Sequence, residues 1–290
     1  NPGLLGSAAL FKKQFLQPIE KKNDQAKAAK LHAMVKPFIL RRMKSQVAGD
    51  LPEKLVQVKY STMAADQEEA YQKVRNYYRD KIVSNLDIRG VGSQRFTLLR
   101  GLTQLRQIAN HPKMVEPEYK GESGKLEDIT YMIRSTVSEG HKILVFSQFV
   151  RHLAIVKNFL QEEGIAFAYL DGQTRDRQAE VESFQQNENI KVFLISLKAG
   201  GVGLNLTAAE YVFLLDPWWN PAVEAQAIDR AHRIGQENRV IIYKFITRDT
   251  VEEKILALQA KKLALAGDLI GSEESFMKSL SKDDISVLLE

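Results

Sequence analysis

The feature that most constrains the fold is an alternation of short apolar segments with helical segments, which starts near residue 142. Strands that are apolar along their whole length are buried on both faces, and the helices between them predict crossover connections between parallel strands. The expected strands are residues 143–149, 166–170, 192–196, 211–215 and 240–245. The sequence therefore predicts an α/β fold with a parallel sheet and helices on both faces, and ligands should bind at the carboxyl ends of the strands.

Helices are expected within this alternation and after it. Residues 150–163 should form a helix that ends at Gly164, and residues 174–185 should form another with Thr174 as its N-cap. Residues 250–266 have the spacing of a long amphipathic helix. Residues 271–290 are polar with scattered leucines, which predicts a mobile tail.

The N-terminal part of the chain is predicted to be mainly helical. Apolar residues recur at helical spacing over residues 11–40, 64–84 and 93–109, with a loop at residues 87–92. Residues 56–61 alternate like a strand. Residues 1–60 hold twelve Lys and Arg against four Asp and Glu, whereas the remainder holds 29 against 32. This basic excess suits a polyanionic partner, although a solvated lysine-rich helix face has the same composition.

Composition excludes several classes of protein. The 290 residues are 44% hydrophobic and 27% charged, as in ordinary globular proteins. The chain has no cysteine, which excludes disulfides, a thiolate metal site and a cysteine nucleophile. No apolar run is long enough to span a bilayer, and the five histidines lack metal-ligand spacing.

The stretch from Ser196 to Gln236 concentrates polar and glycine residues at the carboxyl ends of two expected strands. The last part of this stretch is expected to form a helix. At ~100° per residue, that helix would place four polar side chains in one sector, namely Gln226, Asp229, Arg230 and Arg233. The adjacent apolar sector should dock on the sheet through Val223, Ala227, Ala231 and Ile234. Two arginines one turn apart suit a polyphosphate, because each guanidinium can bind two oxygens and stays charged. The alternative is a solvated face with an Asp229–Arg233 ion pair.

Several segments taken together resemble one family. They are residues 38–44, 51–54, 105–112, 123–127, 142–149, 169–174 and 196–236. As a set, over about residues 1–260, they resemble the SWI/SNF-type DNA translocases of helicase superfamily two, and in particular the C-terminal motor lobe. The resemblance implies a RecA-like sheet, an N-terminal helical protrusion and linker region, and a C-terminal brace helix.

The resemblance also implies a division of the chain. Residues 1–122 would form the helical protrusion and the inter-lobe linker segments, as the tail of lobe one. Residues 123–250 would form the RecA-like lobe two, and residues 251–290 the brace helix and tail. The predicted strand at residues 56–61 would then belong to the sheet of lobe one.

Individual residues acquire roles from the same resemblance. Arg230 and Arg233 correspond to arginine fingers, which stabilise charge on the γ-phosphate of ATP. The residues that would support the ATP site are Gln226, Asp229, Gly201, Gly203 and Asn205. The residues that would contact the DNA backbone are Ser147, Gln148, Gly172, Thr174, Ser196, Lys198 and Ala199. Trp219 is assigned to the DNA side as well, although buried packing is the more usual role of such a residue.

The groups needed for phosphoryl transfer are incomplete in this sequence. Gly124 and Lys125 come nearest to a phosphate-binding loop, but Leu126 stands where the hydroxyl residue belongs. Asp216 ends a strand like a Walker B carboxylate, but Pro217 follows where an acidic residue belongs. We therefore expect ATP and Mg²⁺ to be bound mainly by an absent lobe one, and the chain alone to be inactive in ATP hydrolysis.

The leading hypothesis is the C-terminal lobe of an ATP-dependent double-stranded DNA translocase or remodeller of protein–DNA complexes. Its partners would be double-stranded DNA, lobe one of the same parent chain and DNA-bound proteins, with no membrane. One alternative is a non-catalytic nucleic-acid-binding regulatory module. Another is a metabolic dinucleotide-binding enzyme, although Leu206 replaces the third glycine of that fingerprint. Ala109, where eukaryotic relatives commonly have Cys, favours a bacterial, cytoplasmic and nucleoid-associated source; a eukaryotic source would place the protein in the nucleus.

Overall fold

A computed structural model describes residues 3–22, 24–38, 51–199, 204–266 and 280–289. The chain divides into two compact units, residues 1–50 and residues 51–290. The first unit contains short helices where the sequence predicts helical spacing over residues 11–40. They are α1 (Ala8–Phe11), η1 (Lys12–Leu16), α2 (Gln17–Lys22), α3 (Gln25–Val35) and η2 (Lys36–Phe38). Asp24 separates α2 from α3, because its carboxylate accepts a hydrogen bond from the Lys27 N–H at 3.0 Å and caps α3.

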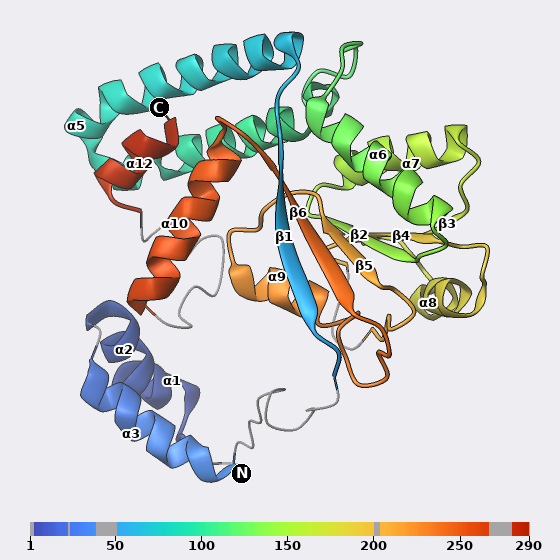
Figure 1. The fold of residues 1–290 in the computed structure, drawn as a ribbon. Helices are drawn as coiled ribbons and strands as arrows, with labels where there is room; N and C mark the ends of the chain where they lie inside the picture. Colours follow the sequence, from blue (N-terminus) through green and yellow to red (C-terminus); the bar gives the residue numbers. More distant parts are fainter. Residues whose placement is uncertain (1–2, 23, 39–50, 200–203, 267–279, 290) are drawn as a thin grey trace. The chain divides into compact units, whose positions relative to one another are not determined.

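The second unit is built on a six-stranded, all-parallel sheet with the order β1-β6-β5-β2-β4-β3 (Figure 1). The strands are β1 (Lys54–Ser61), β2 (Ile143–Ser147), β3 (Phe167–Leu170), β4 (Val192–Ser196), β5 (Tyr211–Leu214) and β6 (Val240–Thr247). Every residue of β2 and β4 is buried, which explains their continuous apolar sequence. The predicted RecA-like parallel sheet is confirmed.

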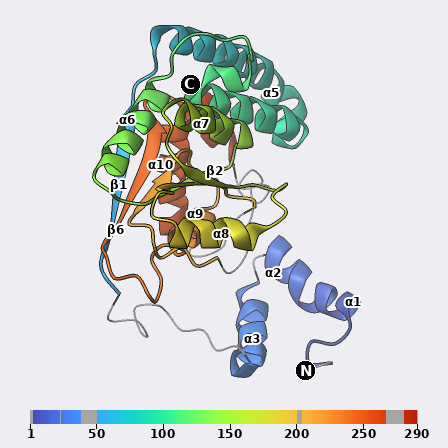
Figure 2. The same ribbon diagram turned by 90° about the vertical axis from the view of Figure 1, so that its right-hand side faces the viewer.

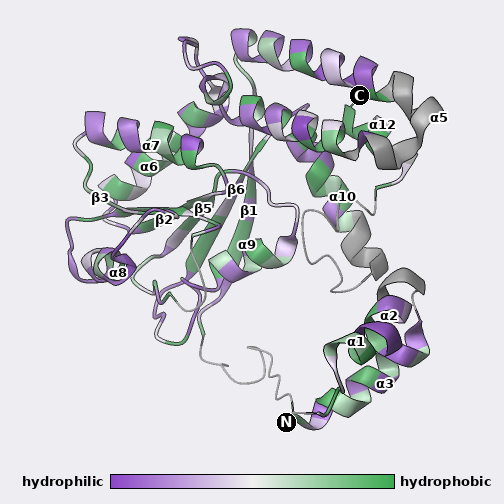
Figure 3. Cartoon of the chain, turned by 180° about the vertical axis from the view of Figure 1, so that it is seen from behind, coloured by the Kyte–Doolittle hydropathy of each residue, from purple (hydrophilic) through white to green (hydrophobic). Residues whose placement is uncertain are grey.

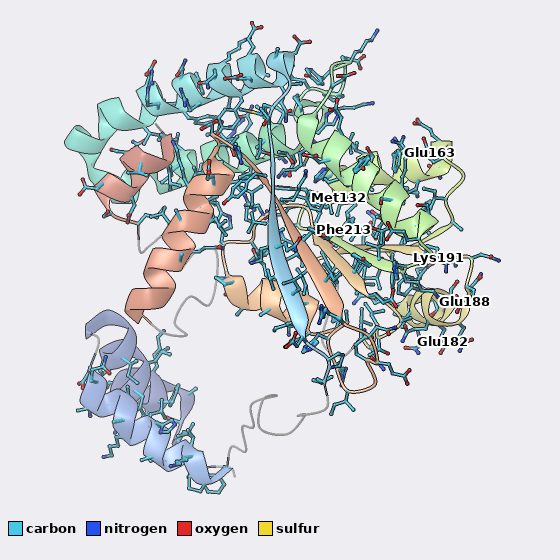
Figure 4. The ribbon with its side chains drawn as sticks, in the orientation of Figure 1. Met132, Glu163, Glu182, Glu188, Lys191 and Phe213 are labelled. Carbon is cyan, nitrogen blue, oxygen red and sulfur yellow. The ribbon has the colours of Figure 1, made fainter. Side chains whose placement is uncertain are left out.

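Helices cover both faces of the sheet (Figure 2). On one face α6 (Gly124–Ser138) and α7 (Val150–Glu162) enclose a core with β2, β4, β5 and β6. On the other face α8 (Arg177–Gln186) and α9 (Pro221–Ile228) enclose a second core. Phe213 of β5, labelled in Figure 4, belongs to the first of these cores, where its ring centroid lies 5.4 Å from that of Phe245. The strands are correspondingly hydrophobic in Figure 3.

Strand β1 corrects the expectation that residues 56–61 belong to the sheet of another lobe. It pairs in parallel with β6 along its whole length, from Lys54 opposite Val240 to Ser61 opposite Thr247. The alternating apolar residues of β1 extend the sheet by one edge strand, because β6 offers an open ladder of the same length. The predicted domain boundaries after residues 122 and 250 stay predictions.

The backbone of α5 (Ala65–Asn110) is helical along its length, but the chain folds back on itself and forms a hairpin (Figure 1). The side-chain amide of Gln67 donates to the Ile108 carbonyl at 2.9 Å, although a straight helix would separate these residues by about 60 Å. The chain therefore reverses between residues 82 and 94, which leaves two antiparallel arms, residues 65–82 and 94–110. The predicted loop at residues 87–92 is wrong as secondary structure, since the backbone there is helical.

The α5 hairpin packs on α10 (Val251–Ala266) and α12 (Lys282–Leu289). Ile285 and Leu288 of α12 are each only 1% exposed. The predicted mobile tail is therefore wrong over residues 280–289, while residues 271–279 lie outside the described part of the chain. The apolar residues at positions 285, 288 and 289 have helical spacing, but the hairpin and α10 together supply the surface that covers them.

Two further details complete the unit. Asp176, and not Thr174, is the N-cap of α8, because its carboxylate accepts a hydrogen bond from the Ala179 N–H at 2.9 Å. A short 3-10 helix, η3 (Pro112–Met114), follows α5. No helix in the described ranges has the length and apolarity needed to cross a membrane.

Candidate functional site

Polar residues meet at the carboxyl ends of β2, β4 and β5, as the sequence predicts. Ser147 of β2 lies opposite Ser196 of β4 in the parallel register, and Asp216 follows β5. The Ser147 hydroxyl donates to one Asp216 carboxylate oxygen, and the Gln148 N–H donates to the other at 3.2 Å. Because Asp216 is only 1% exposed, it holds the loop after β2 in place and does not face solvent.

The residues predicted to contact DNA separate into accessible and buried groups. Ser147, Ser196 and Ala199 are buried. Their side chains therefore shape the loops and do not present contact groups to a ligand. Gly172 and Lys198 are exposed, and Gln148 and Thr174 are half-buried. These last four residues are accessible in this structure, and the DNA roles of all seven stay predictions.

Trp219 is buried in this structure, as in the more usual packing role, and its assignment to the DNA side stays a prediction. The side chain is 0% exposed and packs against the Arg106 guanidinium, whose carbon lies 4.9 Å from the indole centroid. Its neighbour Trp218 is half-buried, and the Trp218 N–H donates to Glu224 at 2.8 Å. Trp219 is buried because the loop after β5 places its ring in the core beneath α5.

Arg106 is a residue of this site that sequence reasoning missed. It lies on the second arm of the α5 hairpin and is 1% exposed. Its guanidinium donates to the Gln148 side-chain oxygen at 3.2 Å and to the Pro217 carbonyl. Arg106 therefore links the hairpin to the loops after β2 and β5. The available signal was a charged residue between the apolar positions 102, 105 and 109 of one predicted helix.

The turn after α9 differs from the predicted helix. Helix α9 ends at Ile228, so Arg230 and Arg233 do not lie one turn apart on a helical face. Arg230 is 8% exposed, and its guanidinium carbon lies 6.0 Å from the Phe146 ring centroid. Burial lowers the pKa of the Arg230 guanidinium from its ordinary value, but arginine remains charged. Arg233 is exposed.

The apolar sector predicted for this helix is only partly correct. Ala227 and Ala231 are buried against the sheet, and Val223 packs on the same core. Ile234 is 74% exposed and does not dock. The helix stops before this residue, and Gly235 with a φ of 99° turns the chain away from the sheet.

The loop after β4 joins the turn after α9 through main-chain and amide hydrogen bonds. The Leu206 N–H donates to the Arg230 carbonyl at 3.1 Å. The buried Gln236 amide donates to the carbonyls of Thr207 at 3.0 Å, Ala209 at 2.9 Å and Ala231 at 3.2 Å. Two segments predicted to form one ATP site are therefore in contact.

The remaining predicted supporting residues are placed individually. Asn205 and Gln226 are exposed, and Asp229 is half-buried. Gly201 and Gly203 lie outside the described residues. The exposed amides and Arg233 make this edge polar and cationic, which suits an anionic ligand.

Lys125, the nearest approach to a phosphate-binding lysine, has a structural role. It is fully buried in an ion pair with Glu252 of α10, and it donates to the Asn110 side-chain oxygen at 2.9 Å and the Leu215 carbonyl at 3.2 Å. Burial lowers the pKa of Lys125 and raises that of Glu252, while each charge opposes the shift of the other. In the described part of the chain, no group of three or more His, Cys, Asp or Glu residues could hold a metal ion.

Two family models match this chain, one over its N-terminal part and one over its C-terminal part. Models of the SNF2-related domain and of the helicase conserved C-terminal domain match residues 1–114 and 124–235. The solved C-terminal domain of the Sulfolobus solfataricus SWI2/SNF2 ATPase is 31% identical, with a TM-score of 0.66, over 98% of that chain and 81% of this one. This chain belongs to the SWI2/SNF2 family. The predicted family resemblance is confirmed.

Longer members of the SWI2/SNF2 family match almost the whole chain. The Sulfolobus solfataricus ATPase core, solved in complex with double-stranded DNA, is 35% identical with a TM-score of 0.69, over 99% of this chain and 61% of that one. A Bacillus subtilis protein that carries the name ATP-dependent helicase/translocase is 37% identical over 99% of this chain. The chain spans about a third of that relative, 32% of its length. Relatives come from bacteria and eukaryotes, so the bacterial source stays a prediction.

Proposed function

We propose that this chain is the second motor lobe of an ATP-dependent double-stranded DNA translocase. The observation that carries the proposal is the hydrogen bond from the Leu206 N–H to the Arg230 carbonyl, because it ties two predicted ATP-site segments together at one edge of the sheet. Membership in the SWI2/SNF2 family supports the assignment.

The ATP site would be shared with a first lobe. ATP supplies the phosphoryl group that is hydrolysed, and the transition state places charge on its phosphate oxygens. Arg233 is exposed and would bind those oxygens directly. Arg230 lies behind it, against Phe146, and would add positive potential from a drier environment. The described residues at this edge offer donors to an anion, but they include no group of carboxylates or histidines that could hold a metal ion. We therefore assign the phosphate cradle and Mg²⁺ to the first lobe.

The DNA contacts would follow three neighbouring strands, β2, β4 and β3. Gln148 comes after β2, Lys198 after β4, and Gly172 with Thr174 after β3. These accessible groups therefore form a row along the carboxyl edge. An amide, an ammonium group and a hydroxyl suit phosphate contacts that do not read sequence. The binding should be nonspecific and weaken steeply with salt.

The decisive experiment is ATP turnover by this chain alone, by the first lobe alone and by the two mixed, each with and without duplex DNA. We expect turnover only in the mixture and a strong stimulation by DNA. Turnover by this chain alone would contradict the shared site. DNA binding without any gain in turnover on mixing would instead support the non-catalytic regulatory module.

A further inference from the structure

A cavity of about 590 Å³ lies between the two arms of the α5 hairpin, outside the site described above. Two side-chain stripes border it. The first arm contributes Lys73, Tyr77 and Lys81, and the second contributes Phe96, Arg100 and Gln104. Each stripe has the spacing i, i+4, i+8, so its members lie along one face of a helix. The cavity is therefore a groove that runs along the hairpin; we call it the hairpin groove.

The hairpin groove lies on the face that α10 and α12 leave uncovered. Buried residues of the arms, among them Ile82, Leu98 and Leu102, join α10 and α12 in one core. Tyr77 and Phe96 take no part in that core and are 57% and 78% exposed. Large aromatic side chains at a cavity mouth are typical of interaction surfaces.

The floor of the groove is apolar and tightly closed. Val74 and Tyr78 form it between the stripes. The arms approach so closely at Gly101 that an added Cβ would lie 2.7 Å from the Tyr78 ring. The Tyr78 hydroxyl is bound to the Gln104 side-chain oxygen at 3.0 Å. A closed floor with polar ends of this kind accepts a bulky apolar side chain inserted from above.

The charge of the hairpin groove is one-sided. Three of the residues that line it are cationic, Lys73, Lys81 and Arg100, and none of the described lining residues is a carboxylate. The Lys81 ammonium lies 5.3 Å from the Tyr77 ring centroid, so cation and aromatic surface are presented together. The matching ligand carries carboxylates beside a bulky apolar group.

We propose that the hairpin groove docks an acidic amphipathic helix of a separate partner protein. Two antiparallel arms with parallel stripes offer the seat for a third helix, whose apolar residues at i, i+3 or i+4 and i+7 would reach Val74 and Tyr78. Its acidic residues would meet Lys73, Lys81 and Arg100. A duplex DNA backbone has no side chain to fill the closed floor, which favours a protein ligand over nucleic acid.

The test uses a displayed library of random 16-residue peptides, selected on the whole chain. Selected peptides are then measured by fluorescence anisotropy against the wild type and against Lys73→Glu/Arg100→Glu. We expect a consensus of Asp or Glu around spaced aromatic or large aliphatic residues, and a loss of affinity of about tenfold or more in the double variant. Phe96→Ser should weaken the same peptides, while Arg79→Glu, on the same arm but outside the groove, should leave them unchanged.

Three outcomes would overturn the proposal. The first is a selected set without acidic residues, or one that binds the double variant as tightly as the wild type. The second is equal loss in Arg79→Glu, which would indicate a general charge effect. The third is tighter binding of a 16-nucleotide single strand than of any peptide, with loss in the double variant, which would make the groove a nucleic-acid site. Circular dichroism confirms that each variant keeps its helix content.

Discussion

The main-chain N–H of Leu206 donates a hydrogen bond to the Arg230 carbonyl at 3.1 Å, so the loop after β4 and the turn after α9 are held as one unit. Because Arg230 is buried and Arg233 is exposed, the turn presents one guanidinium to solvent and keeps the other against the sheet. The two arginines therefore should not be interchangeable.

Replacing Arg233 tests its role toward ATP. In the full-length protein, Arg233→Ala should lower DNA-stimulated ATP turnover by about 10³-fold, because a charge on the transferred phosphoryl group loses its partner. DNA affinity should change by less than about twofold, since the DNA row lies at other strand ends. The control is Arg134→Ala on α6, an exposed arginine paired with Glu163 at 2.9 Å. Wild-type turnover in Arg233→Ala would refute the assignment.

The Gln236 side chain should stabilise the contact between the loop after β4 and the turn after α9. Gln236→Ala leaves three carbonyls without their amide donor and should lower the free energy of unfolding by about 2–3 kcal/mol. Urea denaturation measures the change. Gln178→Ala, which removes an exposed side-chain hydrogen bond to Glu182 within α8, should stay within about 0.5 kcal/mol of wild type. A similar effect of both substitutions would show that the buried amide is not special.

His152 should make stability depend on pH. It is 0% exposed on α7, and in the described structure neither ring nitrogen has a hydrogen-bond partner. Burial lowers its pKa well below the ordinary value, and the charges of Lys125 and His111 add to the shift. Burial also lowers the pKa of His111 to about 4. Below pH ~6.5 the unfolded state therefore binds more protons than the folded state, and stability should fall as pH falls from ~6.5 toward 4.

The substitution His152→Leu isolates this effect. It should reduce the slope of unfolding free energy against pH by up to about 1.4 kcal/mol per pH unit, the value for one proton. Leu153→Ala, a neighbouring core substitution without an ionisable group, should lower stability and leave the slope unchanged. An unchanged slope in His152→Leu would show that the buried ring does not control the pH dependence.

The C-terminal helix should stabilise the α5 hairpin. Leu288→Ala removes a side chain that is 1% exposed and should cost about 2–4 kcal/mol in thermal or urea unfolding. Val287→Ala, one residue earlier and 45% exposed, is the matched control and should change stability by less than about 0.5 kcal/mol. Equal effects would mean that α12 does not pack as described.

Much of the fold could be predicted because its signals are local. Apolar runs such as 192–196 reveal buried parallel strands, and the order of strands and helices restricts the topology. The sequence does not show which distant segment a given strand or helix packs against. Residues 56–61 indicate a strand but not its neighbour. The scattered leucines of residues 285–289 are interpreted from the sequence as a mobile tail, because the hairpin and α10 that cover them lie far away in the sequence.

The sequence by itself determined the parallel α/β sheet and the strand ends at which Ser147, Ser196 and Asp216 meet, because these depend on residue order and on the period of apolar residues. The family followed from the resemblance of the motifs to known members. The tertiary structure decided which side chains are accessible. It buries Trp219 under Arg106, places Arg230 against Phe146 and leaves Arg233 in solvent. Those outcomes depend on contacts between residues far apart in the chain, such as Arg106 with Pro217, and no local pattern encodes such contacts.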